Sequence, residues 1–183
     1  MSAITKDEAR FREAMMAEHA WAEQHEAAIH YSQSASRDNW LGGKPREHVK
    51  LPTDMDCSSY ATYLISRAMW EVYGHEVSAL DPSGYNWNAV GNSTSIAAHA
   101  KKLHRVVPLL EARKGDLAVG SGKHVSILVQ RPSKDPKGPD KHLGTDALVS
   151  SHGNEGGPAG ITLKSEVAYE GVMPIFVRAW VKP

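Results

Sequence analysis

The residues of this 183-residue chain best able to do chemistry are its single cysteine, Cys57, and two of its ten histidines, His124 and His152. A lone cysteine cannot form an internal disulfide, so it either packs as a small apolar side chain or acts as a nucleophile. Cys57 directly precedes an apolar segment with helical spacing. The free N–H groups and the positive dipole end of a helix start favour thiolate over thiol, which predicts an activated nucleophile here.

A thiol nucleophile needs a base to take its proton and return it to the leaving group, and that base needs an orienting partner. His124 opens a predicted strand directly after the turn Gly120-Ser121-Gly122-Lys123, and a strand end beside a glycine turn is a rigid, uncovered position. His152 ends the next predicted strand, so antiparallel pairing would bring it close to His124. Ser150 and Asn154 remain alternatives to His152 for the orienting role.

Metal binding must also be weighed in a chain with so many histidines. His25 and His30 superficially resemble a zinc-protease helix, but that motif needs histidines four residues apart. Here the separation is five, as it is between His99 and His104, which points the side chains about 140° apart on a helix. We therefore expect no metal and no organic cofactor.

The elements that would position these residues follow from apolar spacing and from Gly and Pro. Residues 6–29 lack Gly and Pro and predict a helix that starts with a Thr5–Glu8 capping box. A second helix is predicted over residues 57–73, with Gly74 as its stop, and a third from Ser93 or Thr94 to about residue 103. Strands are predicted over residues 116–119, 124–130, 147–151 and 174–181, with a proline-rich exposed loop at 131–140. Helices followed by a small antiparallel sheet predict an α+β fold.

Composition narrows the class of protein. Lys+Arg and Asp+Glu both total 21, and no long basic block is present, so nothing favours nucleic acid or an anionic membrane as a partner. The N-terminal residues lack the order of a secretory signal, and no stretch is apolar enough to span a bilayer. We expect one monomeric domain over residues 1–183, with the N-terminal helix at 6–29 and a catalytic core at 30–183.

Several motifs resemble a known family. Asp56-Cys57-Ser58-Ser59 resembles the Asp-Cys-Ser-Gly signature of NlpC-type cysteine peptidases, with Ser59 in place of the glycine. Gly115-Asp116-Leu117 and Lys123-His124-Val125 are similar to that family's Gly-Asp strand and histidine strand. More narrowly, residues 52–57, 81–85 and 151–158 resemble the N-terminal peptidase modules of mycobacteriophage-type endolysins, and the match runs from about residue 29 to 181.

The resemblance implies a papain-like fold, with the nucleophile helix packed on the sheet and an extra N-terminal helix. It implies that Cys57 is the nucleophile, His124 the general base and acid, and His152 the orienting residue, with the Cys57 N–H contributing to an oxyanion hole. Tyr31 matches an upstream tyrosine that lines the pocket in that family. No other substrate-binding residue is assigned.

The implied activity is hydrolysis of an amide bond in the stem peptide of bacterial peptidoglycan. Such an enzyme would accumulate in the host cytoplasm and reach the wall after the inner membrane is breached. Two other functions remain open. One is an N-acetylmuramoyl-L-alanine amidase of the CHAP kind, and the other is a non-catalytic wall-binding or virion structural domain.

Overall fold

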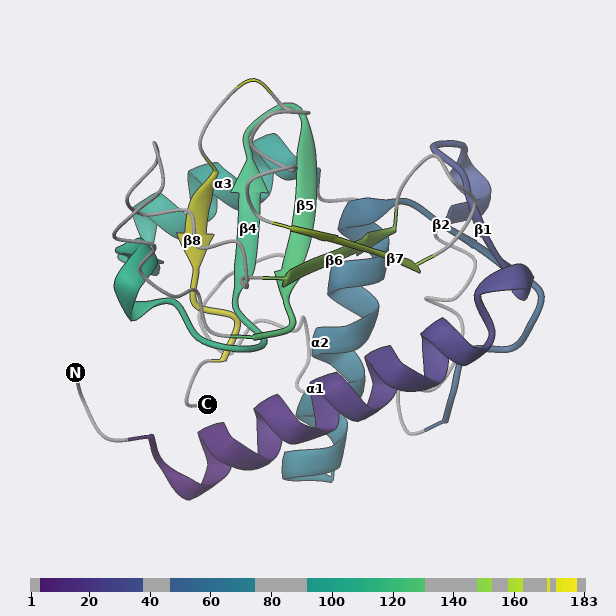
Figure 1. Cartoon of the computed structure of the whole chain (residues 1–183), viewed down its shortest axis with the longest axis horizontal. Helices are drawn as coiled ribbons and strands as arrows, with labels where there is room; N and C mark the ends of the chain where they lie inside the picture. The colour runs from purple at the N-terminus through teal and green to yellow at the C-terminus, as the bar shows by residue number, and fades with distance from the viewer. Residues whose placement is uncertain are drawn as a thin grey trace.

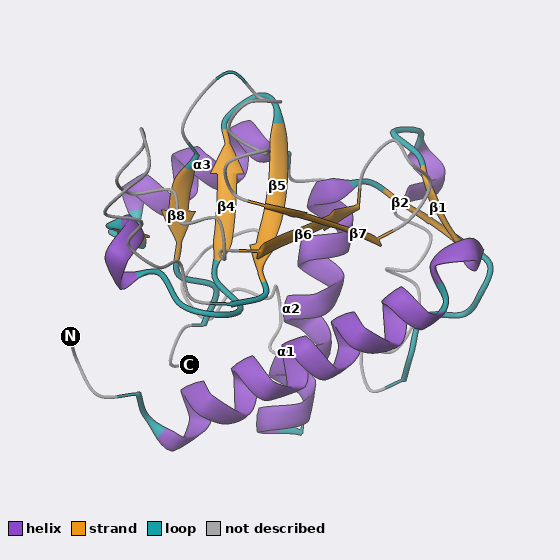
Figure 2. Cartoon of the chain, in the orientation of Figure 1, coloured by secondary structure: helices purple, strands orange, loops and turns teal. Residues whose placement is uncertain are grey.

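The computed structural model describes residues 4–37, 47–74, 92–130, 148–152, 158–162, 171 and 174–180. These residues form helices α1 (Lys6–Gln24), α2 (Cys57–Tyr73) and α3 (Ser93–Lys102), with 3₁₀ turns η1 (Glu26–Ala28) and η4 (Leu109–Glu111). The strands are β1 (Ile29–Tyr31), β2 (Thr53–Met55), β3 (Val106–Val107), β4 (Leu117–Gly120), β5 (His124–Leu128), β6 (Leu148–His152), β7 (Pro158–Thr162) and β8 (Ile175–Val177). The α+β class is therefore confirmed (Figure 2).

The main sheet has six described strands in the order β3-β8-β4-β5-β6-β7, and all neighbouring strands in it are antiparallel. It is larger than predicted, because β3 has only two residues and β7 contains Pro158 and Gly160, so neither shows clear alternation in the sequence. Strands β6 and β7 cross β4 and β5 at a steep angle, which gives the sheet a strong twist (Figure 1). Helices α2 and α3 share one hydrophobic core with one face of the sheet, whose members include Leu64, Ile96, Leu117 and Val125.

Helix α1 is shorter than the sequence predicted. It ends at Gln24, and Ile29 instead pairs with Thr53 in a separate parallel pair of strands, β1 and β2. The β-branched side chain of Ile29 is fully buried there, and this long-range pairing outweighs the helical propensity of the preceding residues. At the start of α1, the Thr5 hydroxyl accepts the Glu8 N–H at 3.1 Å, whereas the Glu8 carboxylate is engaged by Arg12 and Arg113.

Helix α2 has the predicted bounds, and both of its ends have clear local causes. The Asp56 carboxylate accepts the Ser59 N–H at 2.7 Å, while the Ser59 hydroxyl accepts the Asp56 N–H at 2.8 Å, which completes a capping box. Gly74 ends the helix in the left-handed conformation, with φ of 70°. Helix α3 begins at Ser93, earlier than predicted, because Asn92 rather than Ser93 or Thr94 is its N-cap.

A buried ionic network fastens α1 to the sheet. Asp116, the residue directly before β4, is fully buried. Its carboxylate accepts hydrogen bonds from the Arg12 side chain of α1 at 2.9 Å and from the Arg113 backbone N–H at 2.9 Å. The second contact, together with the Asp116 N–H that donates to the Arg113 carbonyl at 2.9 Å, closes a turn at residues 113–116. Burial raises the pKa of Asp116 above its usual value despite Arg12 and Arg178. Burial also opposes ionisation of Glu8, but Arg12 and Arg113 outweigh it there and lower the pKa of Glu8.

Gly115, the residue before Asp116, adopts a left-handed backbone conformation that favours glycine. Its φ is +86°, and a Cβ added there would meet Arg12 and Met15 only at ordinary contact distances of 3.6–3.7 Å. The cost of Gly115→Ala therefore comes from backbone strain, and we expect it to lower the free energy of unfolding by about 1–2 kcal/mol. Urea unfolding measures this loss, with the exposed neighbour Lys114→Ala as the matched control. Equal stability of the two variants would contradict the assignment of strain to residue 115.

Candidate functional site

Cys57 is the first residue of α2, and only 8% of it is exposed. The backbone N–H groups of Val125, Ser58 and Cys57 itself lie near enough to the Cys57 thiol to lower its pKa. Two of these donors belong to the start of the helix, and the third belongs to β5. The thiol therefore lies between the start of α2 and the strand that His124 opens.

The direction of the Val125 N–H shows on which side of β5 the thiol lies. The backbone N–H of Leu128 donates to the backbone carbonyl of Asp116 at 2.9 Å. At Leu128 the N–H of β5 therefore points toward β4. N–H groups alternate between the two edges of a strand, so the Val125 N–H, three residues earlier, points away from β4 and toward β6. The sulfur of Cys57 thus occupies the β6-facing edge of β5.

His152 ends β6, as the sequence predicted, and β6 runs along this same edge. The pairing of β5 with β6 joins Leu128 to Val149 and Ile127 to Ser150, and it stops two residues short of both Val125 and His152. The antiparallel register brings the end of β6 to the end of the sheet where β5 begins. The backbone at His152 and the thiol of Cys57 therefore converge on one corner, while Asn154 lies outside the described residues.

His124 is the first residue of β5 and is half-buried, which confirms its predicted position at a strand start. It pairs with Gly120 across the hairpin, and the turn between them contains Gly122 with φ of 76°. In Figure 1 this hairpin and the first turn of α2 lie toward the same side of the molecule. His124 directly precedes Val125, whose backbone N–H lies near the Cys57 thiol.

The expectation that the helix start favours a Cys57 thiolate is wrong for the protein without substrate. Burial, followed by the negative charge of Asp56, raises the pKa of Cys57 to about 12. The three backbone N–H groups pull this pKa down, as the helix-start argument predicted, but they are outweighed. Burial against β5 is a tertiary effect, which the local sequence does not reveal.

The raised pKa predicts slow alkylation of the native protein. The thiolate is the reactive form, so labelling of Cys57 by iodoacetamide is expected to increase about tenfold for each pH unit up to the pKa of about 12. In urea the unfolded chain no longer buries Cys57 or holds Asp56 beside it, so the thiol pKa falls. Labelling at neutral pH is then expected to be much faster. Mass spectrometry of quenched samples measures both rates. Fast native labelling that is independent of pH above neutrality would show a thiolate instead.

Two further residues lie near the segment that leads into α2: Arg37, which the sequence did not single out, and Tyr31, which the family resemblance did. Arg37 pairs with the buried carboxylate of Asp56, which also accepts the Ser58 hydroxyl at 2.9 Å. Tyr31 lies opposite Met55 in the β1–β2 pair, two residues before Cys57 along the chain, and its hydroxyl accepts from Gln33 at 2.8 Å. The parallel pairing of β1 and β2 thus brings residues 29–37 alongside the segment that leads into Cys57. The motif at 81–85 and the predicted loop at 131–140 fall outside the described residues.

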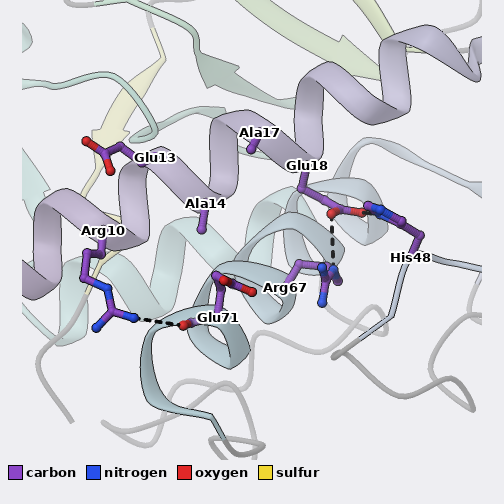
Figure 3. A pocket seen from close by; sticks show the side chains of 8 residues that line it. All are labelled: Arg10, Glu13, Ala14, Ala17, Glu18, His48, Arg67 and Glu71. Carbon is purple, nitrogen blue, oxygen red and sulfur yellow. Dashed lines mark hydrogen bonds and ion pairs between the residues drawn. The ribbon is translucent and has the colours of Figure 1, made fainter.

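A separate groove of about 410 Å³ lies between α1 and α2 (Figure 3). Its lining residues are Arg10, Glu13, Ala14, Ala17, Glu18, His48, Arg67 and Glu71. The buried Glu18 carboxylate accepts from Tyr63, from His48 at 2.9 Å and from Arg67 at 3.2 Å, so its charge is satisfied by the protein. Arg67 is ten residues beyond Cys57, or about 15 Å along the helix, which separates this groove from the thiol.

Among the described residues, no group of three or more His, Cys, Asp or Glu side chains is arranged to hold a metal ion. No helix in the described ranges is long and apolar enough to cross a membrane. No protein-family model matches the chain, and a search of curated proteins gave no significant match.

Proposed function

We propose that this chain is a papain-like cysteine peptidase that hydrolyses an amide bond in the stem peptide of bacterial peptidoglycan. The observation that carries the proposal is the position of the Cys57 thiol, at a helix start and near the backbone N–H of Val125, the residue directly after His124. The substrate class comes from the resemblance of residues 52–57 and 151–158 to endolysin peptidase modules.

The edge position of the thiol supports a partnership with His124. Side chains alternate along β5, so His124 belongs to the same face as Ser126, while Val125 packs in the core with Cys57. A sulfur above one face of the strand would be out of reach of a histidine on the other face. A sulfur at the strand edge can be approached around the end of β5, where His124 stands.

The raised pKa of Cys57 favours proton transfer during attack over a thiolate formed in advance. In the proposed reaction the sulfur attacks the amide carbonyl carbon while its proton passes to the His124 imidazole. His124 then gives this proton to the departing amine, and a thioester remains on Cys57. Water, deprotonated by His124, attacks the thioester, which releases the carboxylate product and restores the thiol. His152 would orient the imidazole, and the Cys57 N–H would donate to the oxyanion.

Fragment analysis of digested peptidoglycan tests this function. The native protein is incubated with purified walls of differing stem-peptide chemistry, and the released fragments are sequenced by mass spectrometry. We expect new amino and carboxyl ends within the stem peptide. Intact stem peptides together with free lactyl-muramic acid would instead identify an N-acetylmuramoyl-L-alanine amidase. Wall binding without release of any fragment would overturn hydrolysis and favour the non-catalytic wall-binding domain.

A further inference from the structure

Arg37 reaches the nucleophile turn from a distant part of the chain. It follows β1 by six positions, and its guanidinium pairs with one oxygen of the Asp56 carboxylate, 19 residues further along the sequence. The other oxygen of Asp56 accepts the Ser59 N–H at 2.7 Å and the Ser58 hydroxyl at 2.9 Å. One carboxylate oxygen of Asp56 therefore caps α2, and the other pairs with the Arg37 guanidinium.

The burial of Asp56 makes this cation important. Asp56 is only 4% exposed, and a buried carboxylate is costly unless its charge is compensated. Its charge also acts on the neighbouring thiol, because after burial it is the second cause of the raised pKa of Cys57. Whatever offsets the charge of Asp56 therefore also eases loss of the proton from Cys57.

We propose that Arg37 is a positioning residue for the nucleophile, whose guanidinium holds the Asp56 carboxylate in the cap of α2 and offsets its negative charge beside the Cys57 thiol. The inference rests on the proposed function only for its effect on turnover. Its effect on the thiol stands independently of any substrate.

The other charged and titratable groups around the first turn of α2 define the alternatives to Arg37. From β5 comes His124, whose neighbour Val125 has its backbone N–H near the thiol, and from the end of β6 comes His152. From the β1–β2 pair, the exposed His30 and the half-buried Asp54 face each other at 3.6 Å. Among these described groups, Arg37 is the one whose ion pair with Asp56 is established by the structure.

The test measures alkylation of Cys57 by iodoacetamide, without peptidoglycan, at a fixed pH of about 8.5. Arg37→Gln removes the cation while retaining a polar side chain, and we expect alkylation to slow by about tenfold, which corresponds to about one unit of thiol pKa. Arg37→Lys keeps the charge and is expected to restore most of the rate. Asp56→Asn keeps the capping oxygen, so in that background Arg37→Gln is expected to change the rate less than twofold.

Thermal unfolding of each variant separates an electrostatic role from a purely structural one. Unchanged alkylation in Arg37→Gln, with or without a lower midpoint, would overturn the proposal. An equally slow rate in Arg37→Lys would also overturn it, because the charge would then not be the cause. A slower hydrolysis that parallels slower alkylation extends the role to turnover. If the native protein hydrolyses no wall, the proposed function fails while the alkylation result still decides the role of Arg37.

Discussion

Replacing Cys57 by alanine is expected to reduce fragment release from peptidoglycan by at least about 10³-fold, because the thioester intermediate cannot form without the sulfur. The substitution removes one atom from a side chain that is 8% exposed, so the free energy of unfolding is expected to fall by no more than about 1 kcal/mol. The measurement pairs fragment release with thermal unfolding of the same preparation. Loss of activity with retained folding assigns the chemistry to the thiol.

Matched histidine variants sharpen this experiment. His124→Ala is expected to lose nearly as much activity as Cys57→Ala, because residues that act as one unit give non-additive losses. His99→Ala, a substitution on α3, is the control and is expected to retain full activity. Unchanged hydrolysis by Cys57→Ala would remove the thiol from the mechanism altogether. Unchanged hydrolysis by His124→Ala alone would leave His152 as the base to be tested.

Breaking the ionic network at Asp116 is expected to have the largest effect on stability. Asp116→Leu removes one of the two carboxylates that Arg12 contacts, at 2.9 Å, and leaves buried Arg12 with only Glu8, which it shares with Arg113. Removing one partner of a buried ion pair costs about 3–5 kcal/mol, whereas replacing both partners by apolar residues often costs little. The midpoint of urea unfolding should therefore fall sharply in the single variant.

The double variant Arg12→Met/Asp116→Leu provides the decisive comparison. It is expected to be more stable than Asp116→Leu alone, although Glu8 then keeps only Arg113 and Arg178 as partners. Glu13→Ala, at an exposed position on the same helix, controls for nonspecific effects of altering α1. Additive losses in the double variant would show that the pair is not coupled in the way its geometry indicates.

The parts of the fold that could be predicted from the sequence are those set by nearby residues. Asp56 and Gly74 fix both ends of α2, and the glycines between Leu117 and His124 fix the β4–β5 hairpin. The end of α1 could not be predicted, because Ile29 leaves the helical pattern to pair with a strand 24 positions away. Strands β3 and β7 were missed because two to five residues carry too little alternation to identify a strand.

The candidate site divides in the same way. The types and positions of Cys57 and His124 could be recognised from local motifs, and both begin the elements that the sequence predicted for them. The raised pKa of the Cys57 thiol could not be predicted, since it depends on burial against β5 and on the charge of the Asp56 carboxylate. Arg37 was missed for a related reason, because an arginine in a polar segment has no signature until Asp56 is found beside it.

The ion pairs of α1 bear on how this chain can be divided for recombination. Glu8 and Arg12 bind groups around β4 and β8, while Glu18 binds Tyr63 and Arg67 of α2. A crossover between homologous or designed chains at residue 29 would separate these charges from their partners, although that position looks like a boundary in the sequence. Chimaeras should keep residues 6–29 with the core and make their junction upstream of Lys6, where the described chain is exposed.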